Sequence, residues 1–565
     1  MTRSRAPLLL GFFILAYILP LNCRPLIEPD ETRYAEIPRA MADGGNWLEL
    51  RLVGLPYYEK PPLGYWLGAA SISALGHHNL AVRLPMALAA GGAALTIFLL
   101  VRARRRRTDP ALGAAAVYLA FFLVFGIGTF AVLDSIFTFF VTLSLALFFQ
   151  AINEKDRRPR LAWLALSGLA CAGGFLTKGF TALVLPVLIL AAWLPWRGLF
   201  KKHLLNCLVP VLVALLAVLP IALALHRANP ASWNYCFWVE HIQRFLEPGP
   251  GQHDEPFWLY LPWILAGALP WTFCLPRALG PIRAKVKAGD GLTTFCLAWL
   301  ALPFLFFSAC GGKIATYILP CFPPLAILLA EAMMESPRDF SPGLKTCAAL
   351  FLALALGAVA WLFFFVPPEL LGPLLADIRP WVLVAGLLLT AAGLGAAPKI
   401  LFFSADRLNG LIWAALATLP LFLAASHCLP EVFINRRSPS VLLAEAARLT
   451  PPGAAIFTDR KTLYAAAWHY RQSGLVFAFG AGELAYGLDR PEGEGRFVPD
   501  ADGLAGLIRR ELAAGRPAVF IVAGNHEKNL SALALSGLEP DLALTRGDFS
   551  WRLYQPKKPA EGGGL

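Results

Sequence analysis

The sequence is poor in charged residues for its length. Only 15% of its 565 residues are charged, whereas 57% are hydrophobic and the mean hydropathy is +0.59. Ordinary soluble domains are about 25% charged and about 45–50% apolar. The missing charge excludes a soluble globule of this size, because such a globule could not hide the excess apolar surface. It also excludes a disordered chain, a collagen and a coiled coil, which leaves a protein that crosses a membrane several times.

Cysteine and nucleotide-binding motifs are also scarce. Ten cysteines occur in the whole chain, mostly inside apolar runs, and none lies beyond Cys428. This usage excludes a disulfide framework and a CxxC metal site. No G-x-x-x-x-G-K-S/T phosphate loop is present, so nothing indicates direct use of a nucleotide. The net charge of +12 comes almost entirely from the apolar part, where loop charge sets orientation, and we therefore expect no nucleic-acid partner.

Thirteen segments are long and apolar enough to cross a bilayer, which takes about 20 mostly apolar residues. We expect membrane-spanning helices over 7–22, 80–101, 110–127, 129–151, 161–177, 179–196, 204–225, 257–276, 291–309, 314–332, 346–366, 379–398 and 408–427. The first is expected to remain as an anchor, because its end, Pro20 to Cys23, offers no A-x-A signal-peptidase site.

Loop charges predict the orientation of these spans. If the N-terminus lies in the cytoplasm, the cytoplasmic segments hold 22 Lys and Arg residues and 8 acidic ones. Five of the basic residues are arginines within 102–107. Basic loops stay on the cytoplasmic side of a membrane. Because thirteen is an odd number, residues 428–565 are then expected on the periplasmic side.

The chain is therefore expected to have two domains. The first is a transmembrane domain over 1–427 with periplasmic loops 22–79 and 226–256, and the second is a periplasmic domain over 428–565. The tail mixes short apolar runs with helix-like stretches, separated by Gly and Pro turns, which is typical of a small soluble α/β domain. The runs are 455–457 and 519–522, and the helix-like stretches are 440–449 and 503–514.

Ionisable residues gather on the predicted periplasmic face. The loop 22–79 places carboxylates, Arg and Lys beside Tyr and Trp, and 31–42 is spaced for a short surface helix. Asp134, Lys178 and Lys313 lie at the same ends of their spans. Each charge alone could be an ordinary interfacial anchor or ion-paired residue. Together they predict a polar cavity roofed by the tail domain, with cations that suit a lipid phosphate.

Several motifs make the chain resemble the lipid A aminoarabinose transferases, which are GT-C membrane glycosyltransferases related to protein O-mannosyltransferases. The motifs are Asp30–Ile37, Tyr57–Trp66, Phe237–Phe245, Thr316–Pro320 and Tyr486–Asp489. The first two are shared widely among the relatives, whereas the third and the last are more specific to the aminoarabinose branch. The resemblance runs from about residue 7 to about residue 500.

This resemblance implies a reaction and its partners. The donor would be 4-amino-4-deoxy-L-arabinose on undecaprenyl phosphate, and the acceptor a phosphate of lipid A in the periplasmic leaflet of the inner membrane. An inverting displacement at the anomeric carbon would join them, and resistance to polymyxin and other cationic antimicrobial peptides would follow. Apart from these lipids and the surrounding membrane lipids, no partner is implied, and we expect a monomer.

The same resemblance implies the site residues. Asp30, Lys60 and Asp134 are the expected catalytic residues; the two carboxylates would orient the sugar or its ammonium group and stabilise developing positive charge. Lys60 and Arg33 would hold the departing phosphate, whose negative charge grows in the transition state. The residues expected to bind the donor phosphate and sugar are Arg33, Tyr34, Tyr57, Glu59, Lys178, Arg244 and Tyr317.

A metal is a further possibility that the family suggests. Glu59 and His241 could share a divalent cation such as zinc. Two ligands are weak grounds for a metal site, and a structural ion pair or interface role for His241 is an equal alternative. No other cofactor is expected.

Two other functions stay open at this point. A relative that moves a different polyprenyl-phosphate sugar to protein Ser/Thr or to another glycan would keep Asp30, Glu31 and Lys60, but it need not keep Glu240–His241 or the tail motif. A polyprenyl-lipid transporter or flippase would instead place charges in mid-span and show symmetry between its halves. The charges here gather at one face, which favours the transferase.

Overall fold

The computed structural model describes residues 5–230, 255–403, 407–524, 531–534 and 537–556. These residues form two compact units. The first, helical unit comprises 1–23, 59–64 and 83–429; the second comprises 24–58, 65–82 and 430–565. Most of the loop after the first span, except 59–64, is thus grouped with the tail, and the predicted boundary after residue 427 stays a prediction.

Nine helices of the described residues are long and apolar enough to cross a membrane. They are α4 (Asn79–Arg105), α7 (Asp134–Ile152), α8 (Arg157–Lys178), α10 (Phe200–Ala228), α14 (Gly291–Ala309), η6 with α15 (Ala315–Cys321, Phe322–Glu335), α16 (Ser341–Phe364), α18 (Ile378–Phe403) and α19 with α20 (Arg407–Leu416, Leu419–His427). At 1.5 Å per residue, even the shorter of these helices nearly match the roughly 30 Å hydrocarbon core.

Two further candidate spans are bent helix pairs. In the first, α5 (Thr108–Leu119) meets α6 (Phe122–Gly128) at 67°. In the second, η4 and α12 (Phe257–Leu259, Tyr260–Gly267) meet η5 and α13 (Thr272–Cys274, Leu275–Lys287) at 99°. The two breaks touch, because the amide of Phe122 donates to the carbonyl of Leu269 over 3.1 Å. Each break thus supplies a partner for a backbone group that the other has freed, as a low-dielectric interior requires.

The predicted count of thirteen spans is approximate. Helical structure stands at every predicted segment, but the described residues give nine spans, or up to eleven with the bent pairs. The other two segments are shorter apolar helices, namely α1, η1 and η2 (Ala6–Phe13, Ile14–Ile18, Leu19–Asn22) and α9 (Thr181–Trp196). A hydropathy pattern measures the length of an apolar run and does not register a bend inside it.

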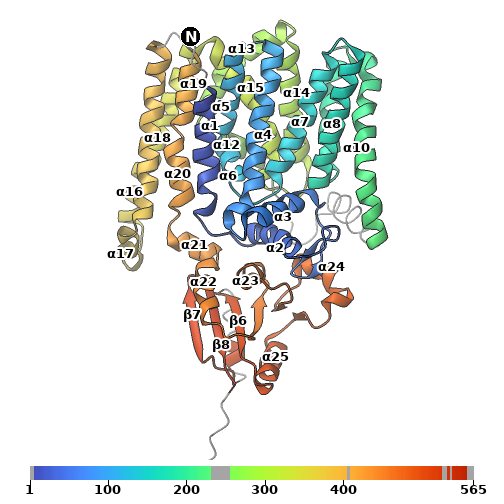
Figure 1. The fold of residues 1–565 in the computed structure, drawn as a ribbon. Coiled ribbons are helices and arrows are strands. Elements are labelled where there is room, and N and C mark those ends of the chain that lie inside the picture. Colours follow the sequence, from blue (N-terminus) through green and yellow to red (C-terminus); the bar gives the residue numbers. More distant parts are fainter. Residues whose placement is uncertain (1–4, 231–254, 404–406, 525–530, 535–536, 557–565) are drawn as a thin grey trace, which may run out of the picture. The chain divides into compact units, whose positions relative to one another are not determined.

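Small residues let the helices of the first unit pack closely. Figure 1 shows α16, α18 and α20 next to one another, and α7, α8 and α10 form a second group. Where α8 crosses α10, a Cβ on Gly168 would lie 2.6 Å from the carbonyl oxygen of Pro210. Glycine is therefore required at this crossing, as in other close membrane-helix contacts.

The second unit is built on a mixed sheet, visible in Figure 1. Its strand order is β5-β4-β3-β6-β8-β7. The first four strands pair in parallel, whereas β8 pairs antiparallel with both β6 and β7. The strands are β3 (Ala455–Asp459), β4 (Val476–Ala478), β5 (Phe497–Val498), β6 (Ala518–Ala523), β7 (Leu542–Arg546) and β8 (Phe549–Tyr554). This sheet confirms the α/β fold predicted for the tail.

Helices complete this unit. They are α21 (Glu431–Arg437), α22 (Ser440–Leu449), α23 (Leu463–Tyr470), α24 (Ala485–Leu488) and α25 (Ala501–Ala513). On α25, Leu504, Ala505 and Ile508 recur at helical spacing and are buried in the core with Phe457 and Phe520. The predicted tail helices at 440–449 and 503–514 are thereby confirmed.

The segment after the first span contributes the rest of the second unit. It contains α2 (Asp30–Ala42), which packs against α23, and the two-residue strands β1 (Arg51–Leu52) and β2 (Leu55–Pro56). α3 (Leu63–Leu75) follows. In the first unit, the remaining short helix is α17 (Pro368–Ala376), between α16 and α18. The predicted helix at 31–42 is confirmed by α2, although most of its residues are buried, and its position on the membrane surface stays a prediction.

Candidate active site

The predicted site residues are divided between the two units, and some lie outside the described residues. In the helical unit are Glu59, Lys60, Asp134, Lys178 and Tyr317; in the second unit are Asp30, Arg33, Tyr34 and Tyr57; Arg244 and His241 lie outside the described residues.

Asp134 and Lys178 form an ion pair in the helical unit. The Lys178 ammonium lies 2.6 Å from Oδ1 of Asp134. Asp134 is the first residue of α7 and Lys178 the last of α8, so each charge complements the dipole of its own helix. The exposed fractions of the two side chains are 10% and 17%, which places the pair in a largely water-excluded setting. Charge-assisted contacts are stronger there than in water.

Aromatic rings surround this lysine. Its Nζ lies 4.4 Å from the ring centroid of Tyr317 in η6 and 5.8 Å from that of Phe137. A cation over a desolvated aromatic face gains further stabilisation. The helical unit therefore brings together three residues that the sequence places 44 and 139 positions apart, and all three had been linked to the site through their motifs or span ends.

The segment with Glu59 and Lys60 lies against the start of α7. A Cβ on Gly64 would be only 2.3 Å from Cδ2 of Leu133, the residue before Asp134. A larger residue at this point would require the Leu133 side chain to move. The Lys60 ammonium donates to the carbonyl of Glu59 at 3.2 Å. This packing brings the 59–64 segment to the end of the unit that holds the ion pair.

In the second unit, α2 positions Asp30 and Arg33. Asp30 begins the helix, where a carboxylate is favourable, and Arg33 one turn later donates to its Oδ1 at 3.0 Å. The other terminal amino group of Arg33 contacts Glu483, whose second oxygen accepts from the hydroxyl of Tyr464 at 2.5 Å. Arg33 is thus held between two carboxylates.

Tyrosines enclose the same arginine. The guanidinium lies 5.1 Å from the ring centroid of Tyr34, which stacks on Tyr65 at 5.7 Å, and Tyr57 meets Tyr65 edge-on at 6.4 Å. Burial by itself would lower the pKa of Arg33, but Tyr57, Tyr34 and Glu483 raise it well above the usual value. Arg33 consequently remains a cation at any physiological pH.

The neighbouring acidic residues of α2 have structural roles. Arg24 forks onto Glu31 with contacts of 2.5 and 3.2 Å, and Arg39 forks onto Glu36 with two contacts of 2.7 Å. Both glutamates are fully buried, whereas the side chain of Asp30 is 52% exposed. Asp30 is therefore the carboxylate of this motif that can meet a substrate.

Comparisons with known proteins identify the family. A family model described as dolichyl-phosphate-mannose-protein mannosyltransferase matches residues 4–236. Over 552 residues, 97% of each chain, the sequence is 36% identical to the undecaprenyl phosphate-α-4-amino-4-deoxy-L-arabinose arabinosyl transferase of Shewanella sediminis. It is also 36% identical to a protein of the same name from Pseudomonas aeruginosa, covering 93% and 96% of the two chains. The chain belongs to this family of arabinosyl transferases.

The fold agrees with this family. The crystal structure of ArnT from Cupriavidus metallidurans bound to undecaprenyl phosphate matches with a TM-score of 0.82 over 98% of both chains, at 22% identity. The predicted GT-C fold is thus confirmed, and the chain is a multi-pass membrane glycosyltransferase.

The predicted metal site gains no support from the structure of this chain. Of its two expected ligands, His241 lies outside the described residues, and no cluster of three metal-ligating His, Cys, Asp or Glu side chains occurs among the residues that are described. Glu59 alone does not make a metal site, so we derive no step through a metal.

The contacts of Lys313 and Glu483 were not predicted from the sequence. Lys313 is buried and donates to the carbonyl of Glu255 at 2.7 Å, which gives it a local structural contact. Glu483 was missed altogether, because it pairs with Arg33 across 450 positions of sequence. The only available signal was its position, three residues before the tail motif that starts at Tyr486.

Proposed function

We propose that this enzyme transfers 4-amino-4-deoxy-L-arabinose from undecaprenyl phosphate to a phosphate of lipid A at the periplasmic face of the inner membrane. The names of the relatives support the donor and the sugar. The observation that carries the proposal is the Asp134–Lys178 pair beside Tyr317, a low-exposure site with a cation, a carboxylate and a phenol. These are the groups that a sugar phosphate donor needs at its reacting end.

The reaction is an inverting displacement at the anomeric carbon. An oxygen of the acceptor phosphate forms the new C–O bond, while the bond from the sugar to the donor phosphate breaks and its electron pair leaves with undecaprenyl phosphate. The acceptor oxygen is already anionic near neutral pH, so no strong general base is required. The main barrier is charge separation, which fixed charges lower.

Asp134 and Lys178 meet these two needs. Asp134 stabilises positive charge that develops on the sugar, or binds its ammonium group, and Lys178 stabilises negative charge on the departing phosphate. In the resting state each neutralises the other at 2.6 Å. The buried pair is therefore kept intact until the substrate offers charges of both signs. Lys60, at the same end of the unit, is proposed as a second contact to that phosphate.

In the second unit, Asp30 is proposed to orient the sugar, and Arg33 to contact a phosphate. Arg33 is already paired with two carboxylates, so a phosphate contact requires exchange of the more exposed one, Asp30, while Glu483 keeps the guanidinium in place. Tyr34 and Tyr57 complete the predicted donor-binding set, and Arg244 remains part of it as a prediction. We also place the N-terminus in the cytoplasm, the tail in the periplasm and the enzyme in monomeric form.

Reconstitution with defined substrates tests this function. The purified enzyme in liposomes is given undecaprenyl-phosphate aminoarabinose and lipid A, and lipid A is analysed by mass spectrometry. We expect one added aminoarabinose per modified phosphate, with the anomeric configuration opposite to that of the donor by NMR. Transfer to a protein Ser/Thr or another glycan but not to lipid A would contradict the acceptor, and movement of the donor across the bilayer without transfer would indicate a transporter.

A further inference from the structure

A cavity of about 570 Å³, lined mostly by charged residues, opens at the opposite end of the helical unit from Asp134. The two ends are connected by α15, which follows Tyr317 and η6 and runs for 14 residues, about 21 Å, to Glu331 and Glu335 at the cavity. Nothing in the transfer reaction uses this end, although the arginine run at 102–107 lies there.

Five helices contribute to the cavity: Lys285 comes from α13, and the other four helices begin or end there. Arg105 ends α4, Arg107 precedes α5, Glu335 ends α15 and Arg407 begins α19. Because all four helices belong to predicted spans, their ends mark the level of the lipid head groups. The volume of the cavity is within the range of about 300–1,000 Å³ that is usual for small-molecule sites.

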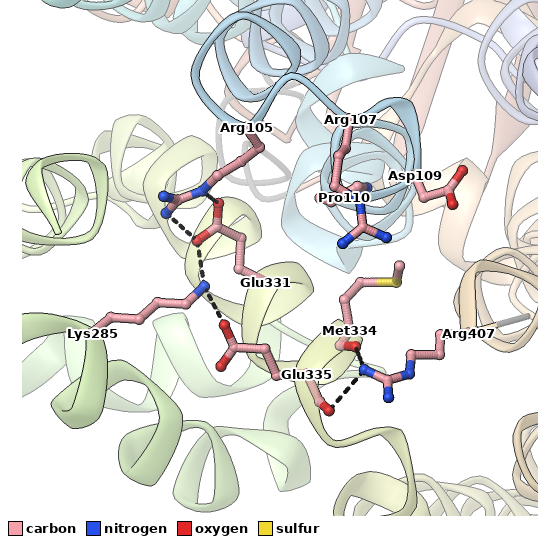
Figure 2. A pocket seen from close by; sticks show the side chains of 9 residues that line it. All are labelled: Arg105, Arg107, Asp109, Pro110, Lys285, Glu331, Met334, Glu335 and Arg407. Carbon is pink, nitrogen blue, oxygen red and sulfur yellow. Dashed lines mark hydrogen bonds and ion pairs between the residues drawn. The ribbon is translucent and has the colours of Figure 1, made fainter. Parts of the chain in front are cut away.

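One wall of the cavity is a set of internally paired charges. Arg105 forks onto Asp290 with two contacts of 2.7 Å and onto Glu331 at 2.5 and 2.7 Å. Lys285 reaches Glu331 at 2.7 Å and Glu335 at 2.9 Å. Figure 2 shows the contacts that link Arg105, Glu331, Lys285 and Glu335 along one side. The carboxylates of the wall are thereby occupied by resident cations.

Two exposed arginines on the other side have free hydrogen-bonding capacity. Arg107 makes no hydrogen bond or ion pair with any residue that the structure describes, although it lines the cavity. Arg407 uses Nη1 for the carbonyls of Met334 and Glu335, at 2.7 and 3.0 Å, and its other N–H groups bond to no described residue. Figure 2 shows the Asp109 carboxylate turned away from the Arg107 guanidinium.

The backbone fixes the position of Arg107. Arg106 has φ +53°, in the left-handed region that side chains rarely adopt, and this residue turns the chain from α4 into α5. Arg107 itself is the extended N-cap of α5, whose free amides add partial positive charge nearby. A non-glycine residue in that region costs free energy and is often retained where a site needs it.

We propose that this cavity binds the phosphate head group of an anionic phospholipid in the membrane leaflet at that end of the bundle. Arginine forks match phosphate oxygens, and basic pockets between membrane helices are known to suit anionic head groups. A cationic ligand would meet four lining cations, of which Arg107 has no partner among the described residues. The inference is independent of the reaction proposed for the other end.

Binding of short-chain lipids to the full-length enzyme tests the site. Purified protein in detergent is titrated with dihexanoyl phosphatidylglycerol, and the bound lipid is counted by native mass spectrometry. Dihexanoyl phosphatidylcholine, which has the same chains and no net charge, is titrated in parallel, and glycerol phosphate tests whether the phosphate binds without a lipid.

The decisive variant is the pair Arg107→Gln with Arg407→Gln. Its matched control, Arg102→Gln with Arg158→Gln, removes two exposed arginines at the same end but outside the cavity. We expect the Kd for phosphatidylglycerol to rise at least tenfold in the first and less than twofold in the second. Arg107→Gln alone, which breaks no contact with the described residues, should raise it at least threefold and serves if the double variant does not fold.

Three results would overturn the proposal. Equal weakening by the control pair would mean general surface electrostatics, and equal binding of phosphatidylcholine would mean that the phosphate charge is not recognised. Tight binding of glycerol phosphate without binding of phosphatidylglycerol would assign the cavity to a soluble phosphate ester instead of a lipid.

Discussion

The candidate site has one well-paired cation in each unit, Lys178 and Arg33, and the two are held in different ways. Lys178 meets its carboxylate through the ends of two helices, α7 and α8, that follow one another in the chain. Arg33 has a nearby carboxylate one helical turn away and a distant one, Glu483, contributed by the tail. The comparison teaches that Lys178 is paired between consecutive helices, whereas Arg33 also needs a contact with a distant part of the chain. The two pairs should therefore respond differently to substitution.

The largest effect is expected at Asp134. Asp134→Asn keeps the shape but leaves Lys178 without its counter-charge and removes the group that stabilises the sugar. We expect kcat for aminoarabinose transfer to fall about 100-fold or more, the size of effect seen when one fixed transition-state contact is lost. A transfer assay with purified enzyme measures it, with Asp156→Asn, in an exposed position, as the control. A rate within twofold of wild type would remove Asp134 from the mechanism.

Lys178 should be the next most sensitive. Lys178→Gln removes the cation over Tyr317, and we expect kcat to fall about 10- to 100-fold. Lys178→Arg keeps the charge but changes its geometry and should recover part of the rate, because the ammonium and guanidinium differ in shape. If Gln and Arg variants were equally slow, charge on this side chain would not be its contribution.

Glu483 tests the long-range half of the comparison. Glu483→Gln should release Arg33 from one carboxylate and lower transfer about tenfold, mainly through kcat, because the Arg33 guanidinium loses its fixed position. Glu494→Gln, which changes an exposed acidic residue of the same unit, is the control. Unchanged kcat together with unchanged KM would show that the Arg33–Glu483 contact is structural only.

The smallest effect concerns Glu28 and pH. Its Oε1 accepts from the amide of Ala465 at 2.8 Å, while Oε2 is buried without a partner among the described residues. Burial raises the pKa of this carboxyl to about 8, against the opposing effects of the nearby Thr32 hydroxyl and the Ala465 amide. A raised pKa favours the protonated folded form, so its contribution to stability is full below about pH 4.5 and is lost as pH rises toward 8.

Glu28→Gln removes this titration. We expect the variant to flatten the fall in melting temperature between pH 5 and 8, as thermal unfolding of the purified protein followed by tryptophan fluorescence would show. The same slope in both proteins would mean that Glu28 is charged in the folded state.

The sequence predicted much of this arrangement. Hydropathy and helical spacing predicted α2, α22 and the α/β tail, and the span ends predicted that Asp134 and Lys178 share a face. The motifs predicted the family, which the relatives confirm.

Other features could not be predicted because they depend on tertiary packing. The bend between α5 and α6 is stabilised by the Phe122–Leu269 hydrogen bond, between residues 147 positions apart. The pairing of Arg24 with the buried Glu31 was likewise not predicted, although Asp30, the exposed carboxylate, had been named from its motif. The cavity beside Arg107 depends on helices from four separate parts of the chain.

The most direct test of the central claim is a double-mutant cycle on the transfer rate. Single-turnover transfer of aminoarabinose to lipid A is measured for wild type, Asp134→Asn, Lys178→Gln and the double variant. If the pair acts as one unit, the double variant should be no slower than the slower single variant, because the second change removes a partner already lost. Losses that multiply independently would contradict a joint role, and wild-type transfer by the double variant would contradict the proposed site itself.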